Sequence, residues 1–391
     1  MVCDAAPTAG RSESGDPASS HGQTLSHHQG PDPKPSTKEH SIDRFCYQYL
    51  QMVSPPEYPP GDLVKSSRVQ NEIFERIFAA QSAPPPKMAR LQLRALKELV
   101  QRIQESVGDD ESDEYAVSDE FMHRIGELMS MPRTSELDEA QHKCIVSYRL
   151  SLLEPPAMID ILENRSLIAA SGTTGLRTWE AGLHLGQYLC MNGHLVRGKR
   201  VLELGAGTGY LSVLCAKYLG AAHVTATDGY EEVVDSLSDN LALNNVQWSY
   251  DPSPLTSDAT VCPKLLKWGH ALMGTEEESW NRGQKVHLVL GADITYDQRA
   301  NPPLVATLRE LLHLFPDAKI LVAATQRNET TSVVFRELCS QNGLCLEEHA
   351  FSLDQIPKHV PDRDVLTPYY TLSMPIHIYY ISLAGRPDGP S

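Results

Sequence analysis

Along the second half of the chain, short apolar runs alternate with longer amphipathic stretches. The apolar runs predict strands at residues 200–205, 223–228, 286–294, 319–325, 345–351 and 377–384. Apolar residues at helical spacing predict helices between the first five strands, at residues 209–219, 230–243, 302–314 and 330–342. This alternation, with continuously apolar strands, predicts an α/β fold in which helices cover both faces of a doubly wound, mostly parallel sheet.

The last two predicted strands have no helix between them. Their connection, residues 352–376, contains prolines and has the composition of a loop. Because antiparallel strands need no helical crossover, the final strand is expected to insert antiparallel.

The first part of the chain has a different pattern. Residues 1–40 are rich in Ser, Gly, Pro, Asp and His and poor in large apolar side chains, which predicts a disordered tail. The acidic run at 108–115 is predicted to be a solvated loop. Residues 41–150 are predicted to form a helical region, and residues 151–391 the α/β domain. The helical pattern occurs in residues 43–53, 68–81, 89–107, 119–131 and 138–154.

Composition narrows the classes of function. The net charge of −16 argues against a large non-specific nucleic-acid surface, which needs clustered Lys and Arg. The 8 cysteines include no C-x-x-C pair, and no histidine pair completes a zinc pattern, so we expect reduced thiols in a cytoplasmic protein and no metal site. The N-terminus lacks the apolar segment of a secretory signal. No run of about 18 apolar residues is present, so no membrane association is expected.

The segment VLELGAGTGY, residues 201–210, joins a predicted strand to a predicted helix through a glycine-rich turn. The dinucleotide fingerprint G-x-G-x-x-G would need a glycine where Tyr210 stands, and a P-loop would need a lysine that this turn lacks. What remains is a turn with Gly205, Gly207 and Gly209, which lets a ligand approach the backbone without a Cβ in the way.

Two acidic residues accompany this turn. Glu203 precedes it by two residues, and Asp228 lies 19 residues beyond Gly209, at the end of the next predicted strand. At that position a carboxylate can accept hydrogen bonds from both hydroxyls of a ribose. Carboxylates favour S-adenosylmethionine, which is cationic at sulfur and has no pyrophosphate. We therefore expect this cofactor, with Glu203 and the glycines at its methionine end and Asp228 at its ribose.

The end of the strand predicted at 286–294 carries the candidate catalytic residues. Asp293 and Tyr296 follow its apolar part, VHLVLG, in the sequence ADITY, at the sheet edge toward which the methyl group would point. We predict that the carboxylate holds an ammonium and positions the amine once it has lost its proton, while the tyrosine packs on the alkyl stem. The alternatives are a cap or turn role for Asp293 and plain packing for Tyr296.

A nearby motif, NPPL at residues 301–304, is similar to an N-P-P-aromatic motif. That motif marks methyltransferases that act on planar amide or adenine nitrogens. Here the fourth residue is Leu304, and the motif begins eight residues past Asp293. Asn301 as an N-cap, with Pro302 at the first helical position, explains the sequence without such a site.

Two tryptophans are candidates for the adenine or methionine pocket, with core packing as the alternative: Trp179 in GTTGLRTW and Trp268 in LLKWGH. With them, the chain resembles the family 16 protein methyltransferases of the seven-strand S-adenosylmethionine-dependent class. The resemblance rests on the segment from Gly172 to Trp179, the ELGAGTG turn, Asp228, Trp268 and the D-x-x-Y of Asp293 and Tyr296. It implies a seven-stranded sheet and methylation of lysine side chains in folded proteins. It also implies cofactor contacts from Trp179, Gly205, Ala206, Gly207, Asp228, Trp268 and Ala292.

Two further features resemble the elongation factor 2 lysine methyltransferases. One is the sequence ILENRSLIAASGTTGLRTW after a helical extension, and the other is the T-x-R-N pattern of Thr325, Arg327 and Asn328. The resemblance implies elongation factor 2 as protein substrate of a cytoplasmic monomer, and the helical region is predicted to dock that substrate. The alternatives are a methyltransferase of the same fold that acts on another protein, RNA or a small molecule, and a non-catalytic binding module.

Overall fold

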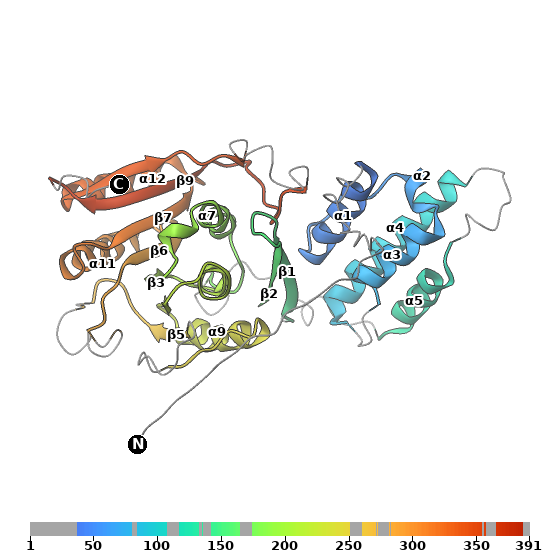
Figure 1. Cartoon of the computed structure of the whole chain (residues 1–391), viewed down its shortest axis with the longest axis horizontal. Helices are drawn as coiled ribbons and strands as arrows, with labels where there is room; N and C mark the ends of the chain where they lie inside the picture. Colours follow the sequence, from blue (N-terminus) through green and yellow to red (C-terminus); the bar gives the residue numbers. More distant parts are fainter. Residues whose placement is uncertain are drawn as a thin grey trace, which may run out of the picture. The chain divides into compact units, whose positions relative to one another are not determined.

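A seven-stranded sheet forms the centre of the α/β part in this computed structural model (Figure 1). In spatial order the strands are β5 (Thr260–Leu265), β4 (His223–Asp228), β3 (Arg200–Leu204), β6 (Leu288–Ala292), β7 (Lys319–Thr325), β9 (Ile376–Leu383) and β8 (Leu344–His349). The first five are parallel, and β9 lies antiparallel between β7 and β8. The predicted doubly wound, mostly parallel sheet and its antiparallel final strand are confirmed.

The structure describes residues 37–79, 84–107, 117–132, 135, 142–164, 174–250, 260–270, 272, 281, 283–353, 356 and 365–385.

Strand β5 is not among the strands predicted from the sequence. It contains Pro263, which has no amide hydrogen to donate and so weakens a strand pattern. Because β5 lies at the edge of the sheet, with an isolated bridge between Val261 and Trp248 on its outer side, the missing donor of Pro263 interrupts no pairing between two strands of the sheet. The other six strands begin and end within two residues of their predicted bounds.

Helices cover both faces of the sheet (Figure 1). On one face, α7 (Glu180–Met191), α8 (Tyr210–Val213), its π-helical continuation (Leu214–Tyr218) and α9 (Glu231–Leu243) enclose one hydrophobic core. On the other, α11 (Asn301–Leu314) and α12 (Glu329–Gln341) enclose a second. Successive strand residues point to opposite faces, and on β3 Val201 belongs to the first core whereas Leu202 belongs to the second. Because the five strands are parallel, their carboxyl ends lie at the same edge of the sheet, and the candidate residues lie there.

Helix α7 is not among the helices predicted from the sequence.

The helical region has a core of its own, with Phe45, Phe78, Leu96 and Phe121 fully buried in it. Because α1 already begins at Thr37, the predicted tail is wrong for residues 37–40, which are helical. Residues 1–36 and the acidic run at 108–115 lie outside the described residues. In the part of the chain that the structure describes, no helix combines the length and apolar character needed to cross a membrane. The helices of the region are α1 (Thr37–Leu50), α2 (Gly61–Val64), α3 (Ser67–Ile77), α4 (Pro86–Ser106) and α5 (Asp119–Ser130).

A two-stranded hairpin follows, and the helix predicted over residues 138–154 is wrong for its described part, residues 142–154. Strand β1 (Cys144–Leu150) pairs antiparallel with β2 (Ala157–Glu163). Every second side chain of β1 is buried, which is the period of a half-buried strand rather than of a helix. The hairpin is separate from the seven-stranded sheet. It connects the helical region to the segment that leads into α7.

Candidate functional site

The glycine-rich turn follows β3 and adopts a conformation that requires glycine. Gly205, Gly207 and Gly209 have φ values of +64°, +53° and +81°, in the left-handed region that residues with a Cβ rarely adopt. A Cβ on Gly205 would also lie 2.7 Å from Cγ2 of Ile294. The turn at the end of β3 therefore has no room for a side chain at Gly205.

Asp228, at the end of β4, lies beside this turn. One carboxylate oxygen accepts from the Gly207 amide at 3.2 Å and the other from the Tyr230 amide at 3.2 Å. The side chain is 8% exposed, and burial raises the pKa of its carboxyl above the ordinary value. The carboxylate thus joins the ends of β3 and β4 and still faces the cavity between them.

Glu203 is more deeply buried, at 4% exposure, and the Ser212 hydroxyl donates to it. Burial raises the pKa of its carboxyl to about 8, and the neighbouring Asp228 carboxylate acts in the same direction. A buried carboxyl of this kind has a strong tendency to pair with a cation, because a cation stabilises the ionised form that burial disfavours.

These groups surround a cavity of about 480 Å³, which is within the usual size range of small-molecule sites. Its lining includes four carboxylates, Glu203, Asp228, Asp293 and Asp297, and two cationic side chains, Arg177 and Lys267. Gly209 is not among the lining residues, since it caps α8 and faces Leu237. The other residues predicted for cofactor or catalysis all line it: Trp179, Glu203, Gly205, Ala206, Gly207, Asp228, Trp268, Ala292, Asp293 and Tyr296.

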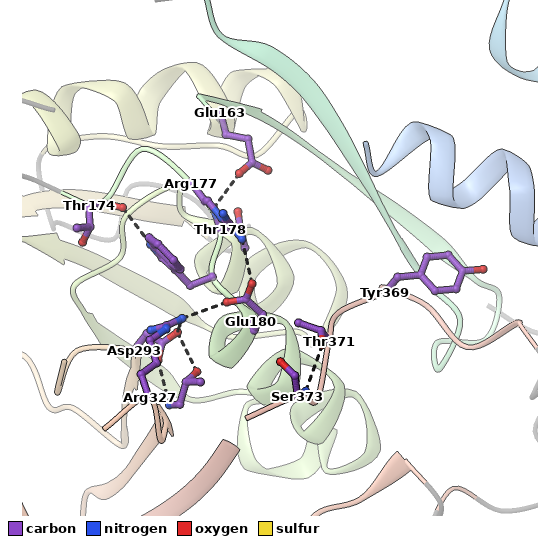
Figure 2. A network of polar contacts seen from close by, with 12 residues as sticks. Glu163, Thr174, Arg177, Thr178, Glu180, Asp293, Arg327, Tyr369, Thr371 and Ser373 are labelled. Carbon is purple, nitrogen blue, oxygen red and sulfur yellow. Dashed lines mark hydrogen bonds and ion pairs between the residues drawn. The ribbon is translucent and has the colours of Figure 1, made fainter. Parts of the chain in front are cut away.

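Asp293 lies just past β6 with φ of +52° and is 7% exposed. Its carboxylate oxygens accept from the Thr325 amide at 3.0 Å, from the Thr325 hydroxyl at 3.1 Å and from the Arg327 guanidinium at 3.2 Å (Figure 2). Its own amide donates to the Ala323 carbonyl at 2.8 Å. Asp293 therefore ties the end of β6 to the end of β7, rather than standing free at the sheet edge.

Arg327 extends this network to α7. Its guanidinium also donates to Glu180 at 3.1 Å, and the second oxygen of Glu180 accepts from Arg177 at 2.9 Å (Figure 2). Both guanidinium carbons lie near the Trp179 ring, 4.6 Å from its centroid for Arg177 and 4.9 Å for Arg327. The two cations hold the indole at the start of α7 by cation–π contact.

A second cavity, of about 420 Å³, lies on the other side of this network. The two cavities share the lining residues Thr174, Arg177, Trp179, Asp293 and Tyr296. The remaining lining of the second comes from the end of β7, the start of α12, Thr295 and Tyr379. One site is thus enclosed mainly by the ends of β3 and β4, the other by the end of β7, and aromatic and acidic side chains separate them.

Comparison of the sequence with known proteins identifies the family to which the chain belongs. A sequence model of a family described as "Lysine methyltransferase" matches residues 164–341. "Protein-lysine N-methyltransferase EFM3" of Chaetomium thermophilum is 48% identical over 338 residues, which cover 86% of this chain and 96% of that protein. The chain belongs to the lysine methyltransferase family.

More distant members of the lysine methyltransferase family carry different names. "EEF1A lysine methyltransferase 3" of Mus musculus is 32% identical over 54% of this chain and 76% of its own length. "Protein-lysine N-methyltransferase EEF2KMT" of Bos taurus is 28% identical over 51% of this chain and 61% of its own length. The family match begins at Asn164, so it includes the glycine-rich turn, the whole lining of the first cavity and the lining of the second cavity except Tyr379.

Several residues of this site were not identified from the sequence. Glu180 belongs to a helix that was not predicted, and Arg327 was noted only as part of a subgroup pattern. Thr178, directly before Trp179, joins its hydroxyl to that of Thr208 at 2.7 Å. Thr178 could have been found from the sequence, because it directly precedes the predicted site residue Trp179. Nothing in the local sequence connects Arg327 to Glu180.

The NPPL segment does not form the cap that was predicted for it. Helix α11 begins at Asn301, Ala300 is the residue that precedes it, and no side chain caps this end. Asn301 is fully buried. Segment Gly172–Thr173 of the predicted motif lies outside the described residues.

Proposed function

We propose that the chain is an S-adenosylmethionine-dependent protein-lysine N-methyltransferase. The observation that carries the proposal is the pair of adjoining cavities with shared lining residues, because methyl transfer between two molecules needs a donor and an acceptor held next to each other. Glu203 and Asp228 supply the carboxyl groups of the donor cavity, and Gly205 and Gly207 line it with their backbone. Membership of the lysine methyltransferase family supports the reaction class.

The residues fit this cofactor in chemical terms. The cofactor, when bound, supplies an activated methyl group on a cationic sulfur. Asp228 would accept hydrogen bonds from its ribose hydroxyls, and Glu203 would pair with its ammonium end. The aromatic side chains of Trp179 and Trp268 would pack against its flat or apolar parts. Carboxylates outnumber cations in the cavity lining, which favours a positively charged ligand over a phosphate.

Asp293 and Tyr296 would orient the acceptor. The acceptor nitrogen would have to be the neutral amine, because only its lone pair can take up the methyl group. Tyr296, 54% exposed, can lie along the alkyl stem of a lysine that enters from the second cavity. Trp179 and Tyr296 would restrict water around the nitrogen, which lowers the pKa of an ammonium and favours the neutral amine.

The protein substrate proposed first is elongation factor 2, in line with the subgroup pattern at Thr325, Arg327 and Asn328 and with a relative named EEF2KMT. The mouse relative named for EEF1A makes that protein the second candidate. A monomer acting in the cytoplasm, with the helical region as docking element for the substrate, completes the proposal.

The test compares both candidates directly. The purified chain is incubated with labelled S-adenosylmethionine and either elongation factor 2 or EEF1A, and the products are mapped by mass spectrometry. Label on a lysine of elongation factor 2 supports the proposal. Label on EEF1A alone would show that EEF1A, and not elongation factor 2, is the substrate. A lysate treated afterwards with nuclease or protease separates RNA from protein acceptors. Deletion of residues 41–130 should abolish labelling of the folded substrate; unchanged labelling would remove the docking role.

A further inference from the structure

The glycine-rich turn is anchored from a second direction by an asparagine on α9. Asn240 is 2% exposed, and its amide nitrogen donates to the carbonyl of Thr208 at 2.9 Å. Thr208 lies in the turn between Gly207 and Gly209 and lines the donor cavity. Because the peptide group is planar, a fixed carbonyl also fixes the orientation of the peptide that leads to Gly209.

The same asparagine pairs with the free edge of the β1–β2 hairpin. Its amide oxygen accepts from the Leu162 amide at 2.8 Å, and its nitrogen also approaches the Leu162 carbonyl at 3.5 Å. Four residues later on α9, Asn244 accepts from the Asp160 amide at 3.1 Å and donates to the Asp160 carbonyl at 2.6 Å. The two side chains thus take the place of a neighbouring strand along β2.

The spacing of the two elements explains why asparagines four residues apart can do this. Four residues of α-helix advance about 6 Å, and two residues of strand advance about 6.6 Å. Leu162 and Asp160 are two residues apart on β2, so each meets one amide. Of the two amides, only that of Asn240 also reaches the turn, whereas Asn244 donates to the carbonyl of Asn240 at 2.8 Å.

A second connection runs from the hairpin to the same residue of the turn. Glu163, at the end of β2, accepts from the Thr178 amide at 2.9 Å and from the Tyr148 hydroxyl. The Thr178 hydroxyl meets that of Thr208 at 2.7 Å. Thr208 is therefore held at its hydroxyl through Thr178 and at its carbonyl through Asn240, and both supports lead back to the end of β2.

We propose that Asn240 is a positioning residue of the donor site, and that it holds the glycine-rich turn in its binding conformation through the Thr208 carbonyl. The inference rests on the proposed use of this cavity for S-adenosylmethionine. It assigns the hairpin a role in donor binding in addition to its place in the fold. Asn244 provides a matched control, because it is equally buried and makes the equivalent strand-edge bonds but has no bond to the turn.

The test measures S-adenosylmethionine affinity by calorimetric titration of the full chain and of Asn240→Ala and Asn244→Ala, together with their melting temperatures. Both variants should melt at lower temperature, since both leave backbone groups of β2 unpaired. Asn240→Ala should weaken binding about tenfold or more, and Asn244→Ala by less than about threefold. Turnover at saturating donor should be the same in both variants.

Equal dissociation constants for the two variants would overturn the inference, while binding by the unmodified chain would leave the proposed function intact. No binding by the unmodified chain would instead overturn the proposed function itself. Should Asn240→Ala fail to fold, Asn240→Leu serves, because it keeps the volume of the side chain but cannot donate to Thr208. Its dissociation constant should rise as for the alanine variant, and an unchanged value counts against the proposal.

Discussion

The ionisation of Glu203 should make the stability of the free protein depend on pH. Burial raises the pKa of this carboxyl from its ordinary 4.5 to about 8. The folded state therefore keeps its proton to higher pH than the unfolded state. The stability contributed by the protonated form is full below pH 4.5 and is lost as pH rises through about 8.

The perturbation that isolates this effect is Glu203→Gln, which cannot ionise and still offers an oxygen to the Ser212 hydroxyl. Each pKa unit corresponds to about 1.4 kcal/mol, so between pH 5 and pH 9 the wild type should lose about 4 kcal/mol of unfolding free energy relative to the variant. Urea unfolding of both proteins, followed by tryptophan fluorescence, measures this difference at each pH. A difference that changes by less than about 1 kcal/mol over that range would refute the reasoning.

Ser212 supplies an internal check on the cause. Its hydroxyl bond favours the ionised carboxyl and so lowers the pKa of Glu203 against the larger effect of burial. Ser212→Ala should therefore move the loss of stability to higher pH.

S-adenosylmethionine should lower the pKa of Glu203 if its cationic end pairs with this carboxyl. Binding should then release protons, and calorimetry in buffers of different ionisation enthalpy detects this release. Proton release equal to that of Glu203→Gln would contradict the pairing.

Three further substitutions test separate parts of the site. Asp228→Ala should weaken S-adenosylmethionine binding about tenfold or more in calorimetric titration, because the ribose loses its carboxylate; unchanged affinity would exclude that contact. Asp293→Asn should lower the turnover number about a hundredfold in a methylation assay at saturating donor, and should change donor affinity by no more than about threefold. An unchanged turnover number would show that Asp293 has a purely structural role. Gly205→Ala should cost about 1–3 kcal/mol of unfolding free energy in urea, since φ is +64° and Ile294 lies 2.7 Å from the added Cβ; a neutral effect would show that the turn relaxes.

The position of the first cavity could be predicted from the sequence because the residues that form it are set by local patterns. The glycines follow β3 directly and Asp228 ends β4, so the strand pattern alone brings them to one edge of a parallel sheet. The same reasoning extended to Asp293 at the end of β6. Gly209 differs from these residues, because its positive φ serves the start of α8 and an added Cβ would meet Leu237. The backbone conformation alone thus accounts for this glycine, and its contact with a cofactor stays a prediction.

The hairpin shows a different kind of error. In β1 the apolar residues Cys144, Val146, Tyr148 and Leu150 occupy every second position, but the apolar Ile145 between the first two weakens this strand signal. The partners that make β2 a stable element, Asn240 and its neighbour on α9, are distant in the sequence. Local periodicity could have identified the strands, but it could not have shown that a helix would pair with their free edge.

The acceptor side depends on contacts that no local pattern contains. Asp293 has a φ of +52°, a conformation that costs a residue with a Cβ about 1 kcal/mol or more. Its bonds to Thr325 and Arg327, formed across strand ends more than thirty residues apart, compensate for this strain and fix the carboxylate before any acceptor arrives. An acceptor amine would therefore meet a carboxylate whose direction is already set, which is the property that orientation-dependent catalysis requires. Such preorganisation follows from the register of β6 against β7, and only a three-dimensional structure reveals it.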